Sequence, residues 1–165
     1  MRKPRENLDQ GFSLIEIVVG VSVLLALFLG TAQHYETSAL ASRASIQETQ
    51  ADYLAEEGIE AVKLLRAESW SEKIAPLQTD DSYGLSYEND AWKAVATPET
   101  VGSFSRSFVL EEVYRGSDDD ILESGTSGGT LDPGTKKLTV SITWQGASGT
   151  STKELTTYMT DLYND

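Results

Sequence analysis

The sequence contains no cysteine, a single histidine and only four prolines in 165 residues. Without cysteine the chain has neither disulfide bonds nor thiolate chemistry. The only histidine, His34, has no second histidine or cysteine with which to build a catalytic or metal-binding set. The sequence also lacks a phosphate-binding loop and a recognised metal-ligand motif, and none of its 26 acidic residues stands out as part of a catalytic pair. We therefore expect that this protein is not an enzyme.

Basic residues are scarce, and the charge is strongly unbalanced. The chain has 13 lysines and arginines against 26 acidic residues, which gives a net charge of −13. Three of the basic residues, Arg2, Lys3 and Arg5, lie at the start, so the chain after position 11 carries −14. An acidic body repels phosphate backbones. We therefore predict no nucleic acid among the partners.

Charge is almost absent from residues 12–30. Their only clearly polar side chains are Ser13, Glu16 and Ser22. A helix over these residues would be about 28 Å long, close to the hydrocarbon thickness of a bilayer. The basic residues in front of this segment predict that the N-terminus stays in the cytoplasm and that the rest is translocated.

Two ordinary interpretations of this apolar segment are a secretory signal peptide and an uncleaved signal anchor. Gly30 and Ala32 are small enough to resemble a signal-peptidase site. Neither interpretation, however, accounts for Gly11 directly before Phe12, or for Glu16 five residues further along.

Glu16 is costly in a membrane. An acidic side chain costs about 2.5–3.5 kcal/mol at the bilayer centre and less near its edge, and such a group usually has a partner. No lysine, arginine or histidine lies between Arg5 and His34. Cleavage of the chain before Phe12 would create the missing partner, a free α-amine.

The stretch Gly11-Phe12-Ser13-Leu14-Ile15-Glu16-Ile17-Val18-Val19 resembles the type IV prepilin cleavage and N-methylation motif. In that motif a short basic leader ends in glycine, and Phe and Ser/Thr-Leu-Ile-Glu open a long apolar helix. The resemblance implies that a prepilin peptidase cuts between Gly11 and Phe12 and methylates the new amine. It also implies that Glu16 pairs with the amine of Phe12 on a neighbouring subunit, where each charge relieves the burial cost of the other.

The resemblance further implies a function, partners and a location. The chain would be a minor pilin or pseudopilin in a type IV pilus-like or type II secretion filament. Its partners would be other pilin or pseudopilin subunits, the prepilin peptidase, the inner-membrane assembly platform and, before assembly, the lipid bilayer. It would be a single-pass protein of the bacterial cytoplasmic membrane with its C-terminal domain outside, and later part of a surface or periplasmic filament.

The alternative function is a membrane-anchored extracellular binding module that never assembles. Calcium binding is one form that this alternative can take.

One departure from the family bears on the subunit type. Many filament pilins have a proline partway along the apolar half of the helix, and this chain has none between Pro4 and Pro76. That absence favours a pseudopilin or minor subunit.

The fold class that we predict is α+β and pilin-like. The expected parts are a leader over residues 1–11, a transmembrane and assembly half of a long helix over 12–33, an amphipathic half over 34–69 and a β-rich part over 70–165. On the amphipathic half, small and apolar residues recur at steps of three or four and predict the face that packs on a sheet. These residues are Ala51, Leu54, Ala55, Gly58, Val62 and Leu65.

The β-rich part is expected to form an antiparallel sheet of about four strands. β-Branched and aromatic residues separated by turn-forming residues predict the strand segments. They are Tyr83–Tyr87, Ala91–Val95, Phe104–Tyr114, Leu138–Trp144 and Ser151–Met159. The three tryptophans are expected to pack in the core or at its rim rather than to form ligand platforms.

Residues 115–135 are predicted to form a glycine-rich acidic loop. Asp118, Asp120 and Glu123 are candidate calcium ligands, because calcium prefers carboxylate oxygens. The spacing is not that of an EF-hand, since the twelfth position counted from Asp118 is Gly129. The resemblance adds that some pseudopilins bind calcium in a C-terminal loop. The alternative is a solvated acidic loop without metal.

Overall fold

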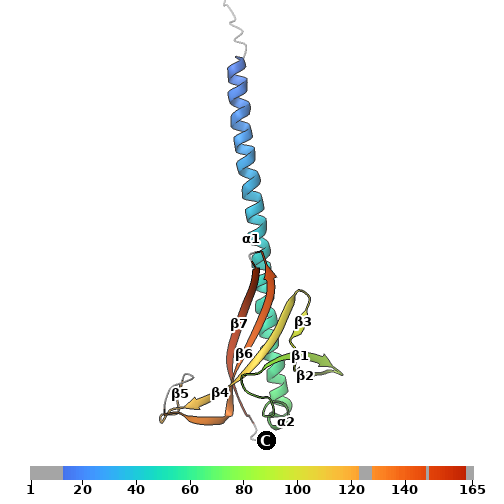
Figure 1. Ribbon diagram of the computed structural model, residues 1–165, viewed down its shortest axis with the longest axis vertical. Helices are drawn as coiled ribbons and strands as arrows, with labels where there is room; N and C mark the ends of the chain where they lie inside the picture. Colours follow the sequence, from blue (N-terminus) through green and yellow to red (C-terminus); the bar gives the residue numbers. More distant parts are fainter. Residues whose placement is uncertain (1–12, 123–127, 148, 163–165) are drawn as a thin grey trace, which may run out of the picture. The chain divides into compact units, whose positions relative to one another are not determined.

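The computed structural model of the chain describes residues 13–122, 128–147 and 149–162 (Figure 1). Two helices precede seven strands in the sequence. The helices are α1 (Leu14–Glu68) and α2 (Trp70–Lys73). The strands are β1 (Ser82–Glu88), β2 (Ala91–Val95), β3 (Glu99–Val101), β4 (Phe104–Arg115), β5 (Ile121–Leu122), β6 (Thr130–Gly146) and β7 (Gly149–Thr160). The chain divides into two compact units between Arg43 and Ala44.

Helix α1 confirms the single long helix expected over residues 12–69, apart from residue 12, which lies outside the described residues. Its first turn forms at Ser13, whose carbonyl accepts hydrogen bonds from the backbone N–H groups of Glu16 (3.0 Å) and Ile17 (3.2 Å). In the first unit the described residues all belong to this helix and the residue that opens it.

Helix α1 ends where Ser69 adopts an extended backbone, with φ −170° and ψ 123°. The Ser69 hydroxyl accepts a hydrogen bond from the backbone N–H of Glu72 at 3.2 Å and so caps the short helix α2. Ser-Trp-Ser-Glu follows the capping-box pattern of a serine three residues before a glutamate. This pattern was a usable signal for α2, which the sequence analysis did not predict.

The second unit contains an antiparallel sheet, as expected, but the sheet has seven strands and not about four. The strand order is β2-β1-β4-β6-β7, and β3 and β5 also pair with β4. Strands β3 and β5 have three and two residues, too few for an alternating pattern to be visible in the sequence. Their positions depend on backbone hydrogen bonds to β4, so only the folded sheet defines them.

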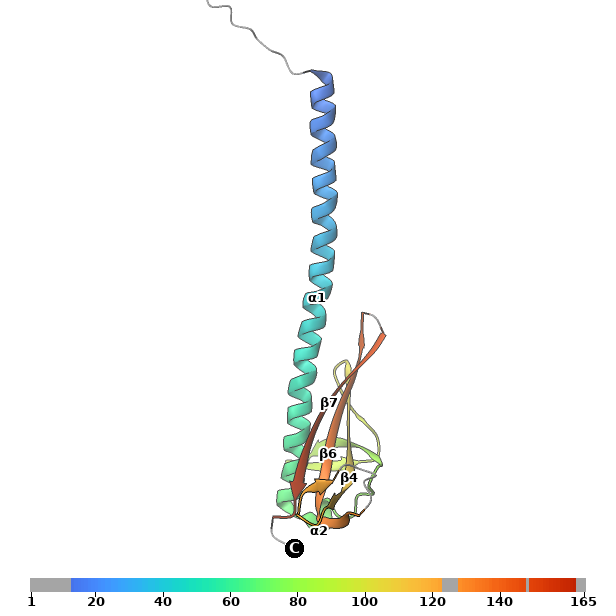
Figure 2. The same ribbon diagram turned by 90° about the vertical axis from the view of Figure 1, so that its left-hand side faces the viewer.

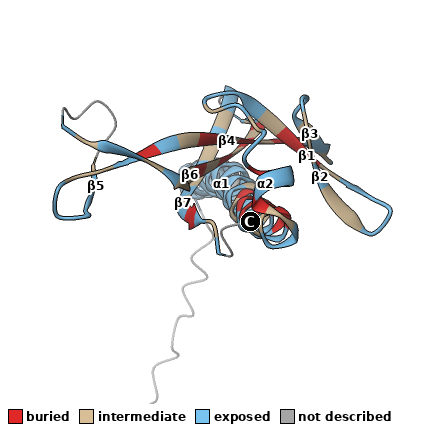
Figure 3. Ribbon diagram, turned by 90° about the horizontal axis from the view of Figure 1, so that it is seen from below, coloured by how far each residue is buried: buried red, intermediate tan, exposed pale blue. Residues whose placement is uncertain are grey.

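The core of the second unit lies between the sheet and residues 44–68 of α1, which run alongside the strands (Figures 1 and 2). The predicted helix face is the buried one. Five of its six residues are buried and Leu54 is partly buried. Buried positions occur on both helices and on the strands (Figure 3). Gly58 permits the close approach, because a Cβ atom there would lie 2.9 Å from Val140 Cγ1.

A β-bulge between Glu112 and Val113 interrupts the alternation of buried and exposed residues along β4. Up to Leu110 the even-numbered residues of β4 face the core and are buried. After the bulge Val113 is buried, whereas Glu112 and Tyr114 are exposed. An unbroken alternation would place Glu112 and Tyr114 on the same face as Phe108, but the extra residue of the bulge reverses it.

Candidate functional site

The first candidate site is the apolar segment of α1 in the first unit. Every residue from Ser13 to Thr31 is exposed, and its large apolar side chains are 49–79% exposed. By length and composition this helix can cross a membrane. So much exposed apolar surface is unfavourable in water, and it requires lipid or other apolar helices around it.

Two hydroxyl groups in this segment, those of Ser22 and Thr31, have partners inside the helix. Ser22 Oγ donates to the carbonyl of Val18 at 2.7 Å, and Thr31 Oγ1 donates to the carbonyl of Phe28 at 2.9 Å. Such back-bonding satisfies a hydroxyl without an external group. These two side chains can therefore enter an apolar environment at little cost.

Glu16 differs from these hydroxyls because its carboxylate has no such partner. It lies exposed in the first turn of α1, where the helix dipole favours a negative charge. Within the described parts of the chain, no side chain forms an ion pair or a hydrogen bond with it. The next basic group of the helix, His34, lies 18 residues further along, about 27 Å away. In an apolar environment Glu16 would need a cation from another molecule or from the chain's N-terminal end. Gly11 and Phe12, the predicted processing residues, lie outside the described residues.

Comparisons with protein-family models, curated proteins and solved structures find no match for this chain. A function must therefore be argued from the chain's own residues. The features available are an exposed apolar helix with one unpaired carboxylate, and a second unit in which the same helix packs on an antiparallel sheet.

The acidic segment after β4 is the second candidate. Asp118 and Asp120 are exposed, and Glu123 lies outside the described residues. Over the ranges that the structure describes, no group of three or more histidine, cysteine or acidic side chains is arranged to hold a metal ion. The predicted calcium site is therefore not assembled from Asp118 and Asp120 together with other described side chains.

The sequence analysis missed the ion pair that organises this segment. Arg115 Nε donates to Asp132 Oδ2 at 2.6 Å, and Arg115 Nη1 donates to the carbonyl of Asp119 at 2.9 Å. The hydrogen bond to Asp132 raises the pKa of Arg115, and the same bond, with one from Thr135, lowers the pKa of Asp132. Arg115, at the start of the predicted loop, thus supplies the cation that binds two parts of this segment.

The prediction of one loop over residues 115–135 is wrong in part. Residues 121–122 form β5, and β6 starts at Thr130 rather than at Leu138. Beyond the bulge, Thr130 pairs with Arg115. Pro133 and Gly134 make this part of β6 resemble a loop in the sequence, because proline and glycine usually mark loops.

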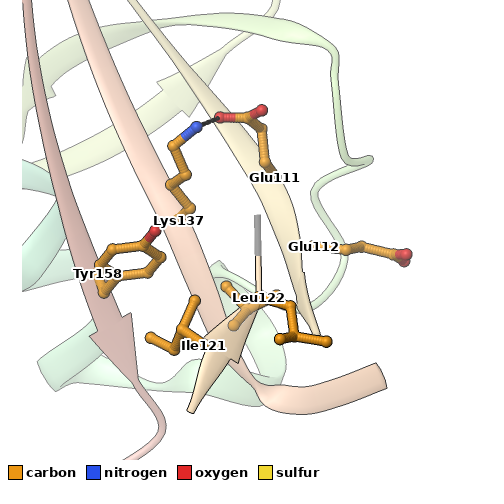
Figure 4. Close-up of a pocket in the computed structure, with 7 residues that line it drawn as sticks. Glu111, Glu112, Ile121, Leu122, Lys137 and Tyr158 are labelled. Atoms are coloured by element: carbon orange, nitrogen blue, oxygen red, sulfur yellow. Dashed lines mark ion pairs between the residues drawn. The ribbon is translucent and has the colours of Figure 1, made fainter. Parts of the chain in front are cut away.

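A pocket of about 390 Å³ lies beside this segment, lined by residues of β4, β5, β6 and β7 (Figure 4). Lys137 and Glu111 point toward each other there and form an ion pair of 2.8 Å. That hydrogen bond raises the pKa of Lys137. Ile121 and Tyr158 line the pocket beside the pair. Because its lysine is already neutralised, the pocket offers little attraction to an anionic ligand.

The most connected polar group of the second unit is buried Arg106 on β4. Its side chain is 2% exposed, and it forms ion pairs with Glu57 of α1 (2.8 Å) and Glu99 of β3 (2.6 Å). Its Nη1 also donates to the carbonyl of Leu54 at 3.1 Å, and its guanidinium lies 5.6 Å from the ring centre of Trp92. All these partners belong to the fold, so Arg106 holds elements together and is not an open binding group.

Proposed function

We propose that this chain is a structural subunit, a minor pilin or pseudopilin, of a type IV pilus-like or type II secretion filament. In this proposal residues 1–11 are removed as a leader. The segment after Phe12 anchors the subunit in the membrane and then packs against other subunits. The second unit faces the outside of the cytoplasmic membrane.

Glu16 is the observation that carries the proposal. It is the one acidic side chain on a fully exposed apolar helix segment whose Ser22 and Thr31 hydroxyls are satisfied internally. A group this costly in lipid calls for a partner. Cleavage between Gly11 and Phe12 supplies one as a free amine, and a neighbouring subunit can bring that amine to Glu16.

The second unit supports the same role. Its sheet packs on the buried face of α1 and leaves the polar face of the helix outside. The unit thus has its own core and does not depend on the apolar segment for burial. A subunit of this design can pass from the bilayer into a filament while its second unit stays folded.

Mass spectrometry of the purified protein's N-terminus tests the processing step. A chain that begins with methylated Phe12 is the expected result. A chain that still begins with Met1 contradicts the proposal, and so does one cut near Ala32. In either case the runner-up, an anchored or secreted binding module that does not assemble, becomes the better description.

The substitution Glu16→Gln tests assembly separately from processing, because glutamine keeps the size of the side chain and removes its charge. We expect normal cleavage and a loss of at least tenfold of the subunit from sheared filaments. The matched control is Ser22→Ala, which removes a polar group of the same segment whose hydrogen bond stays within the helix. If Glu16→Gln assembles as well as Ser22→Ala, the charge-pairing role is wrong.

A further inference from the structure

A second surface pocket, of about 350 Å³, lies in the second unit between residues 44–48 of α1 and the hairpin of β6 and β7. Its volume is at the lower end of the roughly 300–1,000 Å³ that is typical of small-molecule sites. Like the pocket in Figure 4, it is lined by an aromatic side chain, here Trp144, and it also contains polar groups that have no hydrogen-bond partner among the described residues. Its lining residues are Ala44, Gln47, Glu48, Trp144, Gly146, Ala147, Ser151, Thr152 and Lys153.

Trp144 provides the first unpartnered group. The residue is only 8% exposed, and its ring packs against Phe104 with the ring centres 5.8 Å apart. Its indole N–H donates no hydrogen bond to any residue in the described ranges. In the described residues the indole nitrogen is not one of the polar atoms that are both shut off from solvent and without a partner. It is therefore open to water and can donate to a ligand acceptor instead.

The indole nitrogen faces the pocket beside Gly146. A Cβ atom built on Gly146 would lie 3.9 Å from Trp144 Nε1 and 3.0 Å from Ser151 Oγ. The missing side chain at this position therefore leaves the space between the indole N–H and the serine hydroxyl open.

Glu48 provides the second unpartnered group, on the α1 side of the pocket. Its carboxylate forms no ion pair and no hydrogen bond with the described side chains. Lys153, in contrast, is engaged, because its Nζ lies 2.9 Å from Asp52 Oδ1. That hydrogen bond is the main cause of the raised pKa of Lys153. The charge of Glu48 also contributes to that raised pKa. Lys153 is thus shared by two carboxylates, and the pocket keeps an excess of negative charge.

These groups define the chemistry of a ligand. Trp144 offers a donor, Glu48 offers an acceptor, and the Ser151 hydroxyl can serve as either. Sugar hydroxyls both donate and accept. An acidic ligand would meet the Glu48 carboxylate on a chain of net charge −13, and an apolar ligand would leave both polar groups unpaired. We propose that this pocket binds a single neutral or amine-bearing sugar residue.

Nuclear magnetic resonance of the full chain tests this inference, in a phosphocholine detergent that carries no sugar. The three tryptophans give three indole N–H signals, and Trp144→Phe identifies the signal of Trp144 by its loss. N-acetylglucosamine and glucosamine are the probes, with glucuronate as the acidic counterpart. We expect a saturable shift of the Trp144 signal with at least one of the two probes, while the signals of Trp70 and Trp92 stay in place.

Gly146→Ala is the blocking variant, because its methyl group fills the space beside Trp144 Nε1. We expect it to weaken sugar binding at least tenfold. The matched control is Gly134→Ala in the same strand, where a Cβ atom meets its nearest neighbour at an ordinary 3.6 Å. Trp144→Phe keeps an aromatic ring against Phe104 and should weaken binding about two- to tenfold, the range for one lost hydrogen bond.

Three results would overturn the inference. The first is no shift of the Trp144 signal with N-acetylglucosamine or glucosamine. The second is unchanged sugar affinity in Gly146→Ala. The third is tighter binding of glucuronate than of both probes, which would reverse the charge argument from Glu48. None of these results depends on cleavage or filament assembly, so they leave the proposed function to its own tests.

Discussion

Arg106 of β4 and Glu57 of α1 lie 49 positions apart in the sequence and form an ion pair of 2.8 Å in the fold. The arginine is buried at 2% exposure, whereas the glutamate side chain is 53% exposed. The pair therefore runs from the core to the surface, along the line where the helix meets the sheet. Arg106 forms a second ion pair with Glu99 of β3.

Replacing Arg106 with alanine should strongly destabilise the second unit. Removal of one partner of a buried ion pair costs about 3–5 kcal/mol, and we expect the lower end because Glu57 can reach water. Denaturant unfolding of the detergent-solubilised chain, followed by tryptophan fluorescence, measures this cost. The control is Lys136→Ala, at a lysine with no ion pair inside the described ranges. Equal stability of the two variants would show that Arg106 adds nothing to the fold.

Gly58→Ala should destabilise the protein, although alanine favours helices by up to about 1 kcal/mol over glycine. The new Cβ atom would lie 2.9 Å from Val140 Cγ1 and 3.2 Å from Arg106 Cδ. Overpacking of this kind costs about 1–3 kcal/mol, so after the helix gain we expect a net loss of up to about 2 kcal/mol in the unfolding experiment.

The matched control is Gly30→Ala in the same helix, where a Cβ atom would have no neighbour within 4 Å. It should leave stability unchanged or raise it. A stabilising Gly58→Ala would mean that helix and sheet can separate at this point without cost.

Asp132 should make stability depend on pH under acidic conditions. The hydrogen bond from Arg115 is the main cause that lowers the pKa of Asp132 below its ordinary 3.8. A lowered pKa in the folded state means that the stabilisation is complete well above pH 3.8 and is lost as the pH falls through the folded-state pKa. We expect Asp132→Asn to be less stable than the unmodified chain near pH 7, and the difference to shrink below about pH 4.

Unfolding free energies between pH 2 and pH 7 measure this effect. The same Asp132→Asn change made in an Arg115→Gln background is the control. Without the arginine the acid-dependent part of the difference should largely disappear. If it persists unchanged, the pairing with Arg115 is not its cause.

Ser69→Ala should weaken the junction between α1 and α2. It removes the oxygen that accepts the hydrogen bond from the Glu72 N–H. Loss of such an N-cap costs about 0.5–2 kcal/mol, measured by the same unfolding assay. Ser82→Ala, at the exposed start of β1, is the comparison and should change stability by much less.

Much of the local structure could be predicted from the sequence. Helix α1, its buried face and the segments that contain β1, β2, β4, β6 and β7 follow from periodicity and composition, which are properties of neighbouring residues. The bulge at Glu112 and the strands β3 and β5 could not be predicted in this way. Each depends on hydrogen bonds to a strand elsewhere in the chain.

The candidate sites also differ in whether the sequence alone shows them or only the folded structure does. Gly11, Phe12 and Glu16 are recognisable in the sequence alone, because a carboxylate without a nearby cation inside an apolar run is visible in the order of residues. The unpaired Trp144 N–H beside Gly146 is visible only in the fold, since a hydrogen-bond partner can be found missing only when all neighbours are in place.

The sequence by itself thus determined the apolar helix segment, its single carboxylate and the helix face that packs on the sheet, because these follow from side chains within a few turns of each other. Only the tertiary structure decided that buried Arg106 pairs with Glu57 and Glu99, and that Arg115 pairs with Asp132. The physical reason is distance along the chain. A charge can enter the core only where folding brings its partner to it, and no local pattern states which partner that will be.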